Sequence, residues 1–177
     1  MGVTIHYSFV REQIPEDLLK KAEVLAKKLG FAIEERAWNK LIINPHPDSE
    51  WICLHWHKVK TITKREGWDL EKSQIEEQRA GEVDADDWYC GGFTKTHYAG
   101  PECHVKVAEF LRFVASYCEK ANVYDEADYY EKGWTEKTPE ELNEYWDGYN
   151  KTLGNLAGKL KEVFGNKNVF SGADLKA

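Results

Sequence analysis

The stretch Trp88–His104 holds the densest group of polar and reactive side chains in this chain. It reads WYCGGFTKTHYAGPECH, a strand-like start followed by a glycine-containing loop and a proline suited to the first turn of a helix. A lysine in this loop could stabilise an anion, and a glutamate or histidine could act as a general base. The predicted catalytic residues are Lys95, Glu102 and His104.

The same loop could instead bind an anion without catalysis. The N-terminus of the following helix offers unpaired N–H groups, and Gly91–Gly92 and Gly100 would allow close approach to the backbone. Thr94 and Thr96 could complete a phosphate or carboxylate pocket, although the glycine and lysine spacing is not that of a Walker motif. The alternative is a polar strand end followed by an ordinary helix start.

A later acidic group could belong to the same site. Asp125 and Glu126 could pair with Lys95 or bind a divalent cation through oxygen ligands. A solvated edge strand is the alternative interpretation. The predicted ligand-binding residues are Thr94, Thr96, Asp125 and Glu126.

The spacing Cys53-x-His55-x-His57 predicts three metal-ligand types on one face of a strand. Neighbours two apart lie about 6.6 Å apart along a strand, so all three would not easily bind one ion. Two histidines at this spacing could share an ion with a ligand from elsewhere, and His97 and His104 are the candidates. Zn²⁺ is the expected ion if a metal is bound. A half-exposed strand with incidental histidines is the alternative.

Alternating and helical apolar patterns predict the elements that position these residues. Strands are expected over residues 3–10, 31–44, 51–59 and 123–130, with a further strand that begins at 88 and an irregularity near Trp38–Asn39. Helices are expected over residues 15–30, 70–80 and 138–165, with a further helix that begins at Pro101. Strands and helices are interleaved without strict alternation, which favours an α+β fold. We expect a mainly antiparallel sheet with helices packed on one face, in a ferredoxin-like split βαβ arrangement with an extra C-terminal helix.

The length of 177 residues predicts a single domain over 1–165, with 138–165 as a C-terminal helix extension and 166–177 as a tail. A net charge of -7 argues against a nucleic-acid partner. The chain shows neither a signal-peptide pattern nor a membrane-length apolar run, so we expect a cytoplasmic protein without membrane contact. Its four cysteines would then be free thiols or metal ligands.

The run FTKTHYAGPECH, followed by an apolar helix and by Asp125-Glu126 before Tyr129-Tyr130, resembles a family of uncharacterised prokaryotic proteins. Its members carry Phe-Thr-Lys-Thr-x-(Tyr/Phe)-Ala-Gly-Pro-Glu-x-His and a later Asp-Glu-x-x-Tyr segment, usually with Gln where His97 stands. The residues that match the family pattern are Thr94, Lys95, Thr96, Glu102, His104, Asp125 and Glu126. The family has no established activity, so the resemblance marks a site without naming a reaction.

Three functions follow from these patterns. The first is a small-ligand or metal-binding protein that takes a small anionic ligand or a metal ion, in its sharpest form Zn²⁺. The second is a hydrolase acting on an anionic substrate. The third is a structural or interaction module whose aromatic C-terminal helix, with Tyr145, Trp146 and Tyr149, forms a partner-binding or homodimer face.

Overall fold

The computed structural model describes residues 3–59 and 86–130, together with scattered positions between 144 and 155. The chain divides into two compact units, residues 1–133 and 134–177, and the fold below is that of the first. The predicted helix over 70–80, most of the C-terminal helix and the tail lie outside the described residues. The expected single domain over 1–165 stays a prediction.

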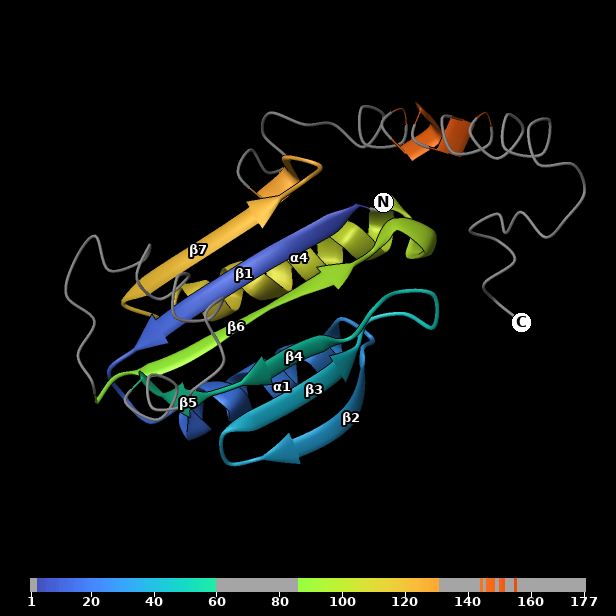
Figure 1. Ribbon diagram of the computed structural model, residues 1–177. Helices are drawn as coiled ribbons and strands as arrows, with labels where there is room; N and C mark the ends of the chain where they lie inside the picture. Colours follow the sequence, from blue (N-terminus) through green and yellow to red (C-terminus); the bar gives the residue numbers. More distant parts are fainter. Residues whose placement is uncertain are drawn as a thin grey trace, which may run out of the picture. The chain divides into compact units, whose positions relative to one another are not determined.

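The first unit is built from strands and helices in mixed order (Figure 1). The elements are β1 (Thr4–Arg11), α1 (Glu16–Lys28), β2 (Ala32–Ala37), β3 (Lys40–Asn44), β4 (Ile52–His55), β5 (His57–Lys58), β6 (Trp88–Lys95), the 3-10 turn η1 (His97–Ala99), α4 (Pro101–Ala115) and β7 (Lys120–Asp125). The predicted irregularity at Trp38–Asn39 is the turn of the β2–β3 hairpin.

Two antiparallel sheets form the framework, one in the order β5-β6-β1-β7 and the other in the order β2-β3-β4. β1 lies between β6 and β7 and pairs with both in antiparallel fashion. β6 and β7 therefore run parallel to each other, and α4 connects them across β1 (Figure 1). The described part of the chain is thus α+β with antiparallel sheets, as the sequence predicts.

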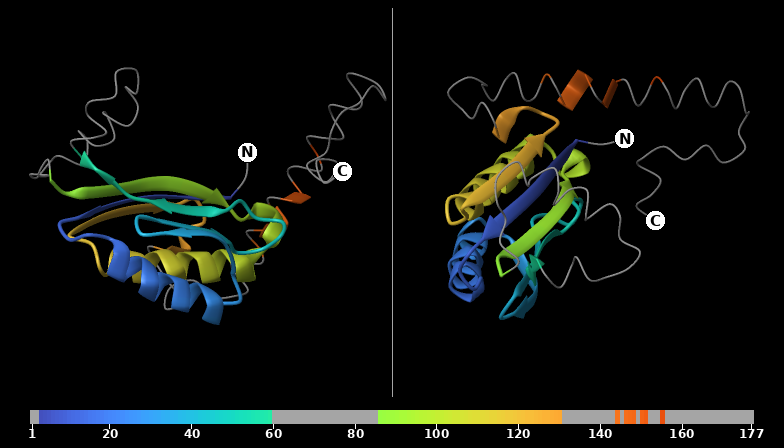
Figure 2. Two further views of the ribbon diagram at one scale, coloured as in Figure 1. Left: turned by 90° about the horizontal axis from the view of Figure 1, so that it is seen from below. Right: turned by 60° about the vertical axis from the view of Figure 1, so that its left-hand side comes forward.

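α1 and α4 cover the same face of the sheet (Figure 2). α1 follows Pro15, carries Glu16 and Asp17 in its first turn, and buries four apolar side chains, Leu18, Leu19, Ala22 and Ala26. α4 begins at Pro101 and buries a wider apolar face that includes Val107, Phe110 and Leu111. Ile5, Phe9 and Trp56 are also fully buried, and the rings of Phe9 and Trp56 stack with their centroids 6.4 Å apart.

The strand predicted over 51–59 is broken at Trp56, which corrects the prediction of one continuous strand. Trp56 donates its N–H to the carbonyl of Asn39, and the Asn39 side-chain amide donates to the Trp56 carbonyl. These bonds replace sheet pairing at this point. The chain leaves β3 here and joins β6, because β4 pairs with β3 and β5 pairs with β6.

Tyr7 bridges the two sheets where they separate. Its hydroxyl accepts a hydrogen bond from the N–H of Cys53 at 3.0 Å and donates to the Cys53 carbonyl at 3.2 Å. Gly92, its partner in β6, leaves room for this ring, since a Cβ there would lie 2.8 Å from the tyrosine oxygen. Gly91 is likewise covered by Tyr89. Tyrosine side chains therefore occupy the space beside Gly91 and Gly92 that we assigned to ligand approach.

Candidate functional site

The Phe93–His104 loop and the segment 125–130 meet through a buried hydrogen-bond chain. Thr96 Oγ1 lies 2.7 Å from His104 Nδ1, and His104 Nε2 lies 2.9 Å from Asp125 Oδ2. The Asp125 carboxylate can only accept, so His104 Nε2 donates to it, and the direction of the Thr96–His104 bond follows the protonation of Nδ1. This hydrogen-bond chain joins the end of β6, the first turn of α4 and the end of β7.

Thr96, His104 and Asp125, the three members of this hydrogen-bond chain, each have an exposed fraction of 0%. Asp125 also accepts the N–H groups of Ala127 at 2.8 Å and Tyr130 at 2.9 Å. Burial on its own raises the pKa of Asp125, but the bonds from His104 and from the two N–H groups outweigh burial and lower it. A buried carboxylate with this many donors holds the two segments together.

The bonds of Asp125 also explain where β7 ends. The sequence predicts an edge strand over 123–130, whereas β7 spans Lys120–Asp125 at the edge of its sheet. The Asp125 side chain captures the following N–H groups, and the chain turns through Asp128, which has a φ of 58°. Glu126 completes the turn by accepting the N–H of Thr4 at 2.8 Å.

Glu50, which the sequence interpretation did not include, links the segment before β4 to the end of β6. Thr94 Oγ1 donates to the Glu50 carbonyl at 2.9 Å, and the N–H of Glu50 donates to the Lys95 carbonyl. The Lys95 ammonium lies 3.5 Å from Glu50 Oε1. Thr94 is fully buried, so its hydroxyl serves the fold and does not face solvent.

The three predicted catalytic side chains lie in different environments. His104 is buried between Thr96 and Asp125. Glu102 is 84% exposed and pairs with Lys106 at 2.9 Å, within α4. Lys95 is half exposed beside Glu50. The structure thus brings His104 and Asp125 together, but it does not gather Lys95, Glu102 and His104 around one reacting group.

His55 and His57 are brought together by the break at Trp56. Their ring centroids lie 4.0 Å apart with an interplanar angle of 50°. His55 is exposed at the end of β4, and His57 is half-buried in β5. Burial first, and then the neighbouring His57 and Lys40, lower the pKa of His55. The lower pKa favours the neutral form of this imidazole at pH 7.

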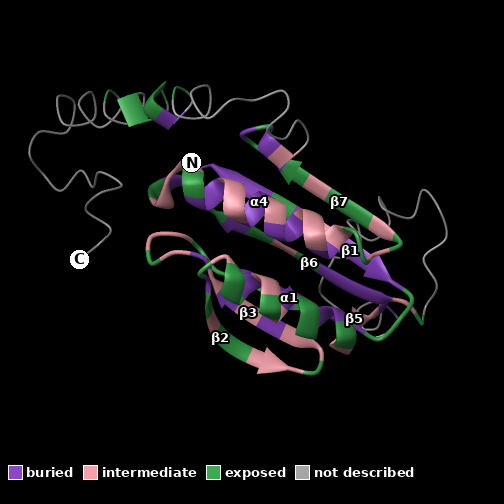
Figure 3. Ribbon diagram, turned by 180° about the vertical axis from the view of Figure 1, so that it is seen from behind, coloured by how far each residue is buried: buried purple, intermediate pink, exposed green. Residues whose placement is uncertain are grey.

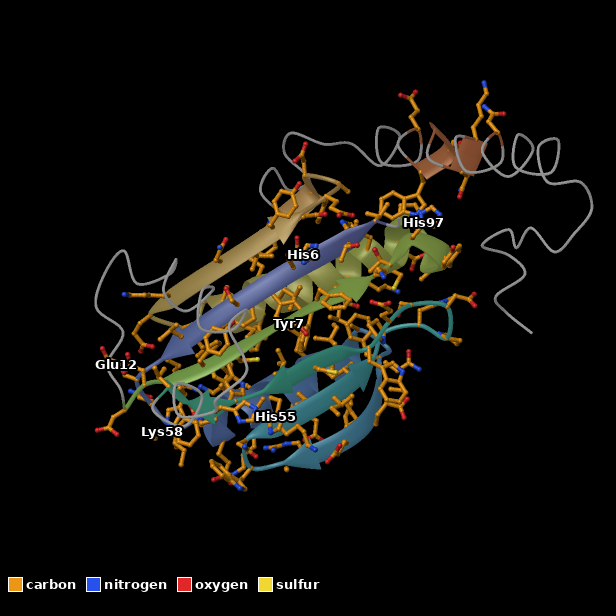
Figure 4. All side chains as sticks on the ribbon, viewed as in Figure 1. His6, Tyr7, Glu12, His55, Lys58 and His97 are labelled. Carbon is orange, nitrogen blue, oxygen red and sulfur yellow. The ribbon has the colours of Figure 1, made fainter. Side chains whose placement is uncertain are left out.

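His97 and His104 lie at the other end of β6 from this pair. His57 pairs with Tyr89 near the start of β6, whereas His97 follows its last residue, Lys95. Six strand residues separate the two ends by roughly 20 Å. Figure 4 shows His55 and His97 on separate parts of the molecule. The four predicted metal ligands therefore form no common centre, and within 3–59 and 86–130 no group of three or more metal-ligand side chains is found.

Two surface features were absent from the sequence interpretation. Phe93, His6 and Tyr124 form a row across β6, β1 and β7, with ring centroids 6.0 and 6.1 Å apart on the face that the helices leave open. The second is a groove between α1 and α4. Strand alternation in the sequence could have indicated the row, but only the pairing register aligns its rings.

No protein-family model matches this chain, and neither a curated protein nor a solved structure matches it. The resemblance carried by FTKTHYAGPECH thus stays a prediction. Among the described residues, none of the helices combines the length and apolar character needed to cross a membrane.

Proposed function

We propose that this protein binds a transition-metal ion, Zn²⁺ in the first instance, through the side chains of His55 and His57. The observation that supports the proposal is the 4.0 Å separation of the two imidazole rings. Two nitrogens on one tetrahedral zinc ion lie about 3.3 Å apart, because each Zn–N bond is about 2.0–2.1 Å long. The two rings lie side by side, and side-chain rotations that turn one nitrogen of each ring toward a common point would place both rings on one ion.

The pKa of His55 favours metal binding. An imidazole binds a metal only in its neutral form, and the lowered pKa of His55 favours that form at pH 7. The nearby ammonium of Lys40 is paired with Glu35, which reduces its repulsion of a cation. The His55 side chain is exposed, so an ion can reach it from solvent.

The proposal keeps only His55 and His57 of the four metal-binding histidines that the sequence suggested. His104 uses both ring nitrogens inside the core, and His97 lies at the far end of β6. A site with two protein ligands leaves two tetrahedral positions open. In this proposal, water or a small anionic ligand coordinates there, which joins the metal and small-ligand forms of the prediction.

Hydrolysis of an anionic substrate has less support. A general base must lie within hydrogen-bond reach of the group from which it takes a proton. His104 is enclosed by Thr96 and Asp125, and Glu102 pairs with Lys106 in solvent. We therefore assign the Thr96–His104–Asp125 chain the role of joining α4 to β7, rather than a catalytic role.

We also infer a ferredoxin-like split βαβ arrangement with the β2–β3–β4 sheet as an addition. The sheet order β5-β6-β1-β7 and the connection of β6 to β7 through α4 across β1 support it. A cytoplasmic location belongs to the same proposal, supported by four cysteines that are all free thiols.

The test is metal analysis of protein purified without a histidine tag, stripped with a chelator and titrated with ZnCl₂ by calorimetry. We expect one Zn²⁺ per chain in the wild type. Replacing His55 and His57 by Ala should weaken binding by more than the roughly 10–100-fold that the loss of an outer-shell partner costs. His6→Ala, which removes another exposed imidazole, is the matched control and should bind Zn²⁺ like the wild type.

Zinc binding should also weaken as the pH falls through the range in which the imidazoles become protonated. The proposal is wrong if stripped wild-type protein takes up no zinc, or if the His55→Ala/His57→Ala variant binds zinc as tightly as the wild type does. Circular dichroism of each variant checks that the fold is kept.

A further inference from the structure

A groove of about 450 Å³ lies between α1 and α4. Figure 3 views α1 and α4 from the side that faces away from the sheet. Residues of two kinds line the groove, four apolar side chains and three lysines: Val24, Leu25, Phe113 and Tyr117, and Lys20, Lys21 and Lys28.

Apolar side chains that line the groove are more exposed to solvent than is usual on a helix surface. Val24 is 54% exposed in the middle of α1, a position where a polar side chain would be expected on the solvent side. Tyr117 is 36% exposed, and its ring lies 5.1 Å from that of Phe113. Contiguous exposed apolar surface of this kind is typical of sites that bind another molecule.

The lysines give the groove a charge opposite to that of the whole chain. The protein carries a net charge of -7, but no Asp or Glu is among the residues that line the groove. Lys20 pairs with Glu16 at 2.8 Å, and the Lys21 ammonium lies 4.6 Å from the centre of the Tyr117 ring. Within the described part of the chain, neither Lys21 nor Lys28 forms an ion pair with a carboxylate.

We propose that this groove docks an acidic amphipathic helix of a partner protein. Lys21 and Lys28 lie seven residues apart on α1, which is two helical turns or about 10.5 Å. A docked helix presents acidic side chains at the same spacing, and its apolar face covers Val24, Phe113 and Tyr117. The charge complementarity selects an acidic partner, and the exposed apolar floor provides the contact area.

The experiment uses a fluorescein-labelled 14-residue helical peptide with leucines along one face and glutamates flanking them, and a second peptide with lysines in place of the glutamates. Fluorescence anisotropy with the full-length protein should show binding of the glutamate peptide and much weaker binding of the lysine peptide. The affinity should fall as the salt concentration rises, because the lysines are exposed.

A charge-reversed variant, Lys21→Glu/Lys28→Glu, should lose at least about tenfold in affinity for the glutamate peptide and bind the lysine peptide better than the wild type does. Lys27→Glu is the matched control, because Lys27 lies on α1 outside the groove and pairs with Glu23. It should leave the preference of the protein for the two peptides unchanged.

Two results would overturn the proposal. One is that the wild type binds both peptides equally or neither. The other is concentration-dependent self-association in sedimentation that Val24→Asp abolishes, because a second copy of the chain would then occupy the groove. Neither result bears on the zinc site, since His55 and His57 lie on β4 and β5, outside the groove.

Discussion

Replacing Asp125 by Asn tests whether the buried hydrogen-bond chain holds the loop before α4 to β7. The substitution keeps the size of the side chain and removes its charge. One Asp125 oxygen accepts from His104 and Tyr130, and the other accepts from Ala127. In the asparagine variant, the amide oxygen can take the place of only one of these two oxygens.

The magnitude follows from these contacts. If the asparagine oxygen keeps His104 and Tyr130, its NH₂ group faces the N–H of Ala127, and an unsatisfied buried donor costs about 1–3 kcal/mol. The two remaining bonds lose the assistance of the negative charge, which costs about 1 kcal/mol more. We expect the variant to lose about 2–4 kcal/mol of unfolding free energy at pH 7.

Urea denaturation followed by tryptophan fluorescence measures this loss. The matched control is Asp128→Asn, because Asp128 is exposed in the same turn and Asn tolerates its positive φ. Equal stabilities of the two variants would refute the reasoning.

The pH dependence of the unfolding free energy gives a second test of the contribution of Asp125. The pKa of Asp125 lies below its ordinary value of 3.8, so its contribution is present above the unfolded-state pKa and is lost as the pH falls through the lower folded-state pKa. The difference between wild type and variant should therefore be constant near neutral pH and shrink below about pH 4.

Two further predictions concern the junction of the sheets and the thiols. Tyr7→Phe removes the hydroxyl that bonds to both backbone groups of Cys53 and should lower the free energy of unfolding by about 2–3 kcal/mol. Gly92→Ala should lower the free energy of unfolding by about 1–3 kcal/mol, because the added Cβ meets the Tyr7 ring. Thermal unfolding checks both, with Tyr98→Phe, at an exposed ring, as the control; equal stabilities would contradict the role of Tyr7. Iodoacetamide at pH 8 should modify exposed Cys53 before Cys103, because Cys103 is buried and burial raises its pKa to about 11. Peptide mass spectrometry follows the order of labelling, and earlier modification of Cys103 would contradict it.

Local patterns in the sequence were enough to predict most of the described elements. The alternation of Val3 to Val10 predicts β1, and the apolar spacing between Pro15 and Gly30 predicts α1. Pro101 marks the first turn of α4 correctly. These predictions succeed because amphipathic periodicity and helix-terminal residues act within a few positions along the chain.

The partners of the polar residues depended on long-range contacts. Alternation predicts that His55 and His57 share a face, but it contains no information on register. The pairing of His57 with the start of β6 places this pair far from His97 and His104. The roles of Gly91 and Gly92 depend on tyrosine rings, one of them from β1.

The sequence by itself determined most of the described helices and strands, the α+β class and the residue types available for chemistry. Only the tertiary structure decided that Thr96, His104 and Asp125 are buried together and that Lys95 and Glu102 stay in solvent. The physical reason is that burial and hydrogen-bond partners are set by the packing of β6, α4 and β7 against β1, and no residue pattern within one segment encodes that packing.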